Sequence, residues 1–204
     1  MLRIMHVDEI ADLLLLLPGL IQQQERRSVD FVRNADAWLN SLEKVFSACR
    51  LHQAGSIATL RSVLVAAGHG LVPAGLQFRG LPSRSRVLNA AAAQALHRAA
   101  EVASTVMAEN QPRLAEAERV AQQVVALSVS RGLIPTRDQG VSNTQYLRRL
   151  RRGLATRDDL ERGIVHLESL VGPHDALVLL DRTLAPHLEH SSAEVDPATM
   201  LSSR

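Results

Sequence analysis

Aromatic residues are scarce in this 204-residue chain, where they make up 2% of the sequence. They are Phe31, Trp38, Phe46, Phe78 and Tyr146. A core with so few rings must be built mainly from Leu, Val and Ala, which suits helices that pack closely. The same scarcity argues against functions that stack single-stranded bases on aromatic surfaces.

Cysteine and lysine each occur once, as Cys49 and Lys44. A single cysteine excludes an intrachain disulfide and is typical of a reducing compartment, so we expect a cytoplasmic protein. Cys49 follows Leu42 and Phe46 at helical spacing, which predicts a buried structural thiol. Because Lys44 is the only lysine, 22 of the 23 basic residues are Arg. This bias is typical of proteins encoded by a GC-rich bacterial genome. The net charge of +2 does not by itself indicate a nucleic-acid binder.

Long hydrophobic runs are also missing. The most apolar stretch, residues 13–21 (LLLLLPGLI), is too short to span a membrane and is followed by three glutamines. Acidic residues precede it, where a secretory signal would be basic. We therefore expect no membrane association and interpret this stretch as a core helix.

Apolar residues recur at steps of three and four along most of the chain, and no segment alternates with a period of two. This pattern predicts an all-α fold, an elongated helical bundle of six to eight helices around a long, kinked central helix at about 83–131. Pro112 interrupts that helix. We favour a kinked continuous helix over a tight hairpin, because the apolar stripe continues across the proline.

The glycine-rich residues 68–82 are the clearest internal boundary. We expect one helical domain at 1–190, with two subdomains, 1–80 and 81–190, as the alternative, and a disordered tail at 191–204. The glycine-rich stretch lacks the Lys and the preceding strand of a phosphate-binding P-loop, so we interpret it as a helix end followed by a chain reversal.

Helix starts are predicted where a short polar residue precedes an apolar stripe. Ser28, Ser56 and either Ser83 or Ser85 fit this description, and Thr156 with Asp159 forms a capping-box pattern.

Four arginines gather around Leu150, on a segment predicted to be a short helix. Guanidinium groups at this spacing can contact phosphates or an acidic partner. The candidate binding residues are these four together with three that could extend the cluster: Arg148, Arg149, Arg151, Arg152, Arg84, Arg86 and Arg137. The alternative is local salt bridges, because residues 136–190 contain eight Arg and eight acidic residues.

Arg182 and His187 have the spacing Arg, four residues, His. This resembles the minimal signature of HEPN ribonucleases, all-helical enzymes in which such a pair handles the scissile phosphate. The resemblance implies a metal-independent RNase as an alternative function. No motif for a metal or cofactor site is present, so we expect none. His97 and His166 are expected to be partly buried within helices.

The lack of a catalytic constellation, together with a long Ala-rich helix, favours a non-enzymatic interaction protein, an adaptor or accessory subunit of an oligomer or larger complex. Its expected partner is a protein or a second copy of itself. A nucleic-acid-associated protein that contacts phosphates through the arginine cluster is the alternative.

Overall fold

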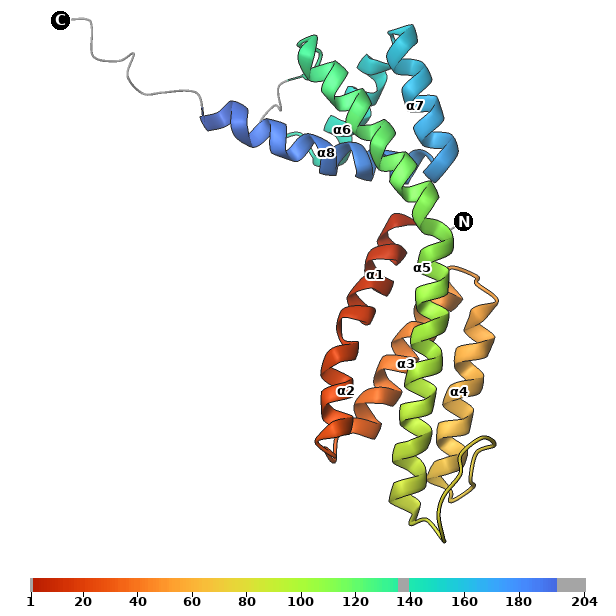
Figure 1. Cartoon of the computed structure of the whole chain (residues 1–204). Coiled ribbons are helices and arrows are strands. Elements are labelled where there is room, and N and C mark those ends of the chain that lie inside the picture. The colour runs from red at the N-terminus through yellow and green to blue at the C-terminus, as the bar shows by residue number, and fades with distance from the viewer. Residues whose placement is uncertain (1, 136–139, 194–204) are drawn as a thin grey trace, which may run out of the picture. The chain divides into compact units, whose positions relative to one another are not determined.

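The computed structural model describes residues 2–135 and 140–193, of which residues 188–193 are placed by their backbone alone. All regular structure in these residues is α-helical (Figure 1). The helices are α1 (Ile4–Leu15), α2 (Leu17–Glu25), α3 (Phe31–Ala48), α4 (Gln53–Gly68), α5 (Arg84–Ser130), α6 (Asn143–Leu154), α7 (Asp158–Val171) and α8 (Pro173–Ala193). The prediction of an all-α bundle of six to eight helices is confirmed.

Backbone contacts divide the chain into two compact units, Met1–Asn110 and Gln111–Arg204, here called unit 1 and unit 2. The division falls inside α5, which continues through Pro112, so no tight hairpin forms there. The sequence-based boundary in residues 68–82 instead lies within unit 1. Residues 191–193 belong to α8, and the rest of the predicted tail, residues 194–204, lies outside the described residues.

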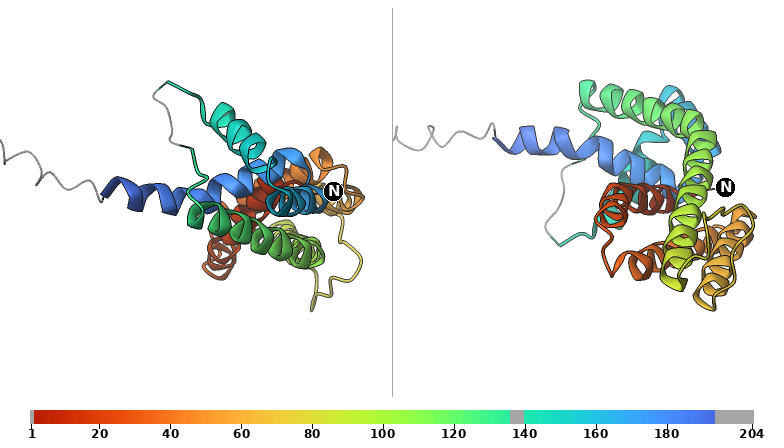
Figure 2. Two further views of the ribbon diagram at one scale, coloured as in Figure 1. Left: turned by 90° about the horizontal axis from the view of Figure 1, so that it is seen from above. Right: turned by 60° about the horizontal axis from the view of Figure 1, so that its bottom comes forward.

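In unit 1, α3 lies between the α1–α2 pair and α4, and the first part of α5 packs along them (Figures 1 and 2). Phe31, Phe46 and Trp38 are buried in the centre. The buried face of α5 in this unit consists mostly of alanine: Val87, Ala91, Ala92, Ala95, Leu96, Ala99, Ala103 and Val106. Small side chains on α5 let the neighbouring helices approach closely.

The break between α1 and α2 is held in place by Trp38. Its indole Nε1 donates a hydrogen bond of 2.7 Å to the carbonyl of Leu13, and the residue is 4% exposed. Pro18 lies in the first turn of α2, and Leu16 joins the two helices in a helical conformation. The chain therefore bends at the proline and continues, because the tryptophan and the residues around Leu16 satisfy the backbone there.

The interpretation of residues 13–21 as a core helix is only partly right. Leu20 is buried, but Leu15, Leu16 and Ile21 are 76%, 58% and 48% exposed. The apolar run covers more of the helix surface than one core-facing stripe needs, so part of it faces solvent.

Helix boundaries differ from the predicted caps at three of the four positions. Ser83 does cap α5, because its Oγ accepts a hydrogen bond of 3.3 Å from the amide of Arg86. Ser56 instead lies inside α4. Ser28 is not the cap of α3, because that helix begins at Phe31, after Asp30. The capping box at Thr156 does not form: Arg157 is the N-cap of α7 and no side chain caps that helix, while the Thr156 hydroxyl donates to the carbonyl of Gly153.

The predicted buried thiol is only half-buried. Burial raises the pKa of Cys49, and the charge of Glu9 adds to this effect. A raised pKa keeps the sulfur protonated and a poor nucleophile, in agreement with a structural role.

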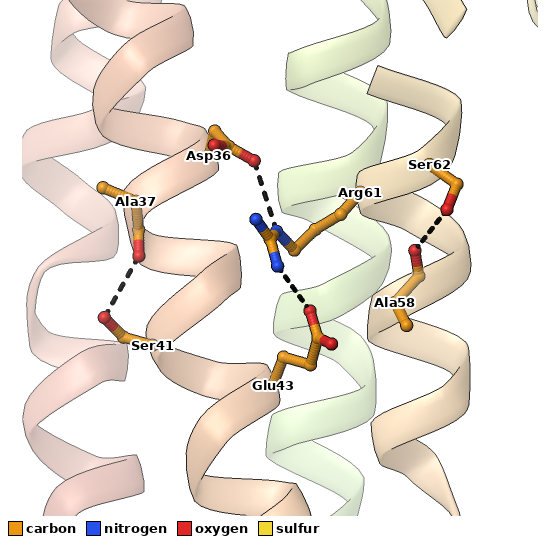
Figure 3. Close-up of polar contacts among 7 residues, drawn as sticks. All are labelled: Asp36, Ala37, Ser41, Glu43, Ala58, Arg61 and Ser62. Carbon is orange, nitrogen blue, oxygen red and sulfur yellow. Dashed lines mark hydrogen bonds and ion pairs between the residues drawn. The ribbon is translucent and has the colours of Figure 1, made fainter. Parts of the chain in front are cut away.

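The α3–α4 pair carries a charged clasp on its surface, drawn in Figure 3. Arg61 of α4 donates to Glu43 at 2.7 Å and to Asp36 at 3.3 Å, both on α3. The hydrogen bond to Glu43, followed by the contact with Asp36, raises the pKa of the guanidinium. One arginine thus ties together two positions on α3 about two turns apart.

Unit 2 contains α6, α7 and α8 with the last part of α5. Its buried hydrophobic residues are aliphatic apart from Tyr146, whose hydroxyl donates to the carbonyl of Pro135 at 3.1 Å, and Ser128 and Asp175 are buried beside them. Arg113 donates to the carbonyl of Leu170 at 2.8 Å, near the end of α7. Gly163 is packed so tightly against α5 that an added Cβ would lie 2.7 Å from a methyl carbon of Val124.

We expect Gly163→Ala to destabilise the protein by about 1–3 kcal/mol, because the new methyl group has no room beside Val124. Gly153→Ala is the matched control, since a methyl group added to this helical glycine would have nothing within 4 Å. That change should stabilise by about 0.5–1 kcal/mol. Urea unfolding measures both. In a Val124→Ala background the cost of Gly163→Ala should fall, and an unchanged cost would contradict this packing.

Candidate functional site

The arginine cluster lies on α6, whose start is set by Ser142. The Ser142 hydroxyl accepts from the amide of Gln145 at 3.4 Å, which caps the first turn of the helix. The inner face of α6 is aliphatic and aromatic, with Tyr146, Leu147, Leu150 and Leu154 buried. Because these positions recur at helical spacing, the arginines between them are directed outward.

Arg151 is a structural residue. Its guanidinium donates through Nε and Nη2 to the two carboxylate oxygens of Glu168 on α7. The Glu168 side chain is only 17% exposed, and this hydrogen bonding raises the pKa of Arg151. For this residue the salt-bridge alternative describes what the structure contains.

Arg148 and Arg152 differ from Arg151. Together with it they line a surface cavity of about 430 Å³ whose other wall is the start of α8, at Pro173 and His174. Neither Arg148 nor Arg152 has an ion pair among the described residues, whereas Arg149 has a polar interaction of its own. The amides of the first turn of α8 add partial positive charge near this cavity, and the buried carboxylate of Asp175 in the same turn opposes it.

The three predicted extensions of the cluster are not brought to α6 by the described contacts. Arg84 and Arg86 belong to unit 1, at the start of α5, while α6 belongs to unit 2. Arg137 lies outside the described residues. A single site made of all seven arginines therefore stays a prediction.

Arg86 has different neighbours from those expected. Arg86 lines a cavity of about 650 Å³ together with Arg27, at the end of α2. Arg27 is not among the residues predicted from the sequence, because the pairing of the α2 end with the α5 start is a tertiary contact. Its only sequence signal is the Arg26–Arg27 pair that follows the glutamines.

Two apolar grooves flank α2. One, of about 350 Å³, lies between α2 and α5 and is lined by Leu17, Ile21 and Leu96 among others. The other, of about 380 Å³, lies between the α1–α2 pair and α3, with Leu16 and Trp38 in its lining. The exposed side chains beside these grooves are Leu16, just before α2, and Ile21, within α2.

The ribonuclease-like pair lies on α8, which continues through Pro186. Arg182 and His187 are both exposed, and Arg182 has a polar interaction. Positions five residues apart are about 140° apart around a regular helix, so the backbone does not place this pair on one face. The RNase alternative gains no support from this arrangement.

The described residues contain no group of three or more His, Cys, Asp and Glu side chains that could hold a metal ion. His97 and His166 were expected to be partly buried, but their side chains are 78% and 53% exposed. Within residues 2–135 and 140–193, no helix is long and apolar enough to cross a membrane.

Comparison with known proteins finds no matching family model, and neither a curated protein nor a solved structure shows significant similarity to this chain. Its function must therefore be inferred from its own surfaces and cavities.

The different roles of the α6 arginines can be tested by stability. Arg151→Gln should lower the free energy of unfolding by about 1–2 kcal/mol, because it leaves the partly buried Glu168 carboxylate without its partner. Arg148→Gln and Arg152→Gln should change it by less than about 0.5 kcal/mol, since neither side chain holds two helices together. Urea unfolding of the three variants measures these changes. Equal losses of unfolding free energy would mean that Arg148 and Arg152 are structural as well.

Proposed function

We propose that this chain is a non-enzymatic helical interaction protein that associates with a second copy of itself through the surface of α1 and α2 in unit 1. The observation that carries the proposal is a run without charge. Residues 13–24 contain no charged side chain, although 22% of the chain is charged, and several of their aliphatic side chains are exposed.

Depletion of charged residues is a property of interface centres rather than of ordinary surface. The end of the run consists of glutamines, which can form hydrogen bonds across an interface without requiring an opposite charge. Exposed Leu15, Leu16 and Ile21 would lose unfavourable contact with water on association.

A second copy is the occupant that fits this surface best. An exposed aliphatic side chain borders an apolar groove on each side of α2: Leu16 borders the groove toward α3, and Ile21 borders the groove toward α5. In a twofold dimer an exposed side chain of one copy can enter a groove of the other, and the reverse contact forms at the same time. Since residues 13–24 are uncharged, the two copies meet there without electrostatic repulsion.

Alanine on α5 also favours this arrangement. Ala93 and Ala100 form part of the wall of the α2–α5 groove, and their short side chains leave room for a partner's aliphatic side chain.

Ile21→Asp should weaken self-association at least about tenfold, because it places an unpaired charge in the centre of the interface. Val65→Asp is the matched control: Val65 is an exposed β-branched residue of α4, 60% exposed, that lines neither groove. Sedimentation velocity over a concentration series measures the association, and circular dichroism verifies that both variants are folded.

A wild-type chain that is monomeric at every concentration would contradict the proposal, as would an equal effect of the two substitutions. Binding to neutral lipid vesicles in place of dimerisation would assign the same apolar surface to a membrane.

A second candidate, a nucleic-acid-associated protein, is favoured by the arrangement of Arg148 and Arg152. Both line one cavity on unit 2, and neither is neutralised by an ion pair among the described residues. Guanidinium groups in this state can contact backbone phosphates.

For this candidate, we expect binding to duplex or single-stranded nucleic acid that falls with salt. Each of Arg148→Ala and Arg152→Ala should reduce the slope of log K against log salt by about 1. Arg157→Ala, at an exposed arginine just before α7, is the control. Absence of binding at low salt, or binding unchanged by the first two substitutions, would contradict it.

A further inference from the structure

A polar cavity of unit 1 lies where the end of α2 faces the start of α5. Its volume is about 650 Å³, and Arg27 and Arg86 stand on its walls. The other lining residues are Gln24, Ser83, Ser85, Asn89 and Ala90. This lining supplies guanidinium, hydroxyl and amide groups and includes no carboxylate.

The surrounding chain is strongly basic. Residues 22–28 and 83–90 together contain four arginines and a single acid, Glu25. None of the four, Arg26, Arg27, Arg84 and Arg86, has an ion pair among the described residues. Two other arginines of unit 1 are neutralised: Arg61 pairs with Glu43 and Asp36, and Arg33 pairs with Asp30. The positive charge at this cavity is therefore uncompensated within the described part of the chain.

Arg86 is oriented without being neutralised. Its guanidinium carbon lies 5.7 Å from the centre of the Phe78 ring, a cation–π contact that leaves the charge and the N–H donors available. Phe78 belongs to the loop between α4 and α5, so this loop supports one wall of the cavity.

The start of α5 adds to the effect of the arginines. Ser83 caps the helix by accepting the amide of Arg86, and its own hydroxyl hydrogen remains able to donate. The amides of the first turn of a helix carry partial positive charge and favour an anion.

We propose that this cavity binds a phosphate group, carried by a small phosphorylated molecule, with Arg27 and Arg86 as its charge partners. A tetrahedral phosphate has enough acceptor oxygens to receive hydrogen bonds from two guanidinium groups and from serine hydroxyls at once. A carboxylate has only two oxygens in one plane and would leave part of these donors unused. This site does not depend on self-association, because its charged walls lie outside the two apolar grooves.

The chain contains a matched control for Arg27. Arg27 and Arg50 both follow a helix in the left-handed conformation, with φ of 54° and 55°. In each case the next amide bonds back to the preceding helix at 2.9 Å, Ser28 to Gln23 and Leu51 to Phe46. Glycine is the residue that this conformation favours, so Arg→Gly removes one charge and relieves the same backbone strain at both positions. Arg27 lines the cavity and Arg50 does not.

The test is calorimetric titration of the full chain with pyrophosphate and with inorganic phosphate at low ionic strength, using acetate as the carboxylate control. We expect one site per chain, with pyrophosphate bound more tightly than phosphate and acetate bound more weakly than either. Arg27→Gly and Arg86→Gln should each weaken pyrophosphate binding at least about tenfold, whereas Arg50→Gly should change it less than about twofold.

Three results would overturn the proposal. One is no heat of binding with pyrophosphate at millimolar concentration. Another is an equal loss of pyrophosphate binding in Arg50→Gly, which would mean that the anion is attracted by the overall positive charge of the protein and not by this cavity. The third is a loss of the same size in the Arg148→Gln, Arg152→Gln double variant, which would place the anion on α6. Thermal unfolding of Arg27→Gly and Arg50→Gly, expected at or above the wild-type temperature, shows that each remains folded.

Discussion

The core of each unit includes a buried face of α5 that is built mainly from small side chains. In unit 1 its buried face is mainly alanine, and in unit 2 Ala117 and Ala121 continue the same kind of surface. Gly163 of α7 shows how little space remains, since even a methyl group would meet Val124. With so few aromatic rings, the core is filled mainly by Leu, Ile, Val and Ala side chains. One helix thus supplies part of the core to both units.

The apolar run of the α1–α2 pair is wider than one core-facing stripe, so part of it lies at the surface. The α1–α2 pair bends at Pro18, and Trp38 satisfies the carbonyl of Leu13 at that bend. Leu20 fills the core, while Leu16 and Ile21 stay at the surface beside two grooves. Uncharged aliphatic side chains beside apolar grooves can complement the same surface of a second copy, and this is the basis of the function proposed for this chain.

Arginines of identical chemistry have different surroundings in this structure. Arg61 and Arg151 each join two helices through carboxylates, while Arg148, Arg152 and Arg27 line cavities without an ion pair among the described residues. The eight Arg and eight acidic residues in 136–190 indicated local salt bridges but did not indicate which residues form them. Sequence spacing places side chains on one helix face, whereas the carboxylates that pair with Arg61 and Arg151 come from another helix.

The sequence by itself determined the helical class and the long α5, with Ser83 or Ser85 as its cap, because these follow from local periodicity and local hydrogen bonds. It also indicated the outward face of α6, since Leu147, Leu150 and Leu154 alternate with the arginines at helical spacing. Only the tertiary structure decided that Leu16 and Ile21 are exposed, that Arg151 is paired, and that Arg27 meets Arg86 across a cavity. These three outcomes depend on contacts between residues far apart in the chain, and no local pattern carries that information.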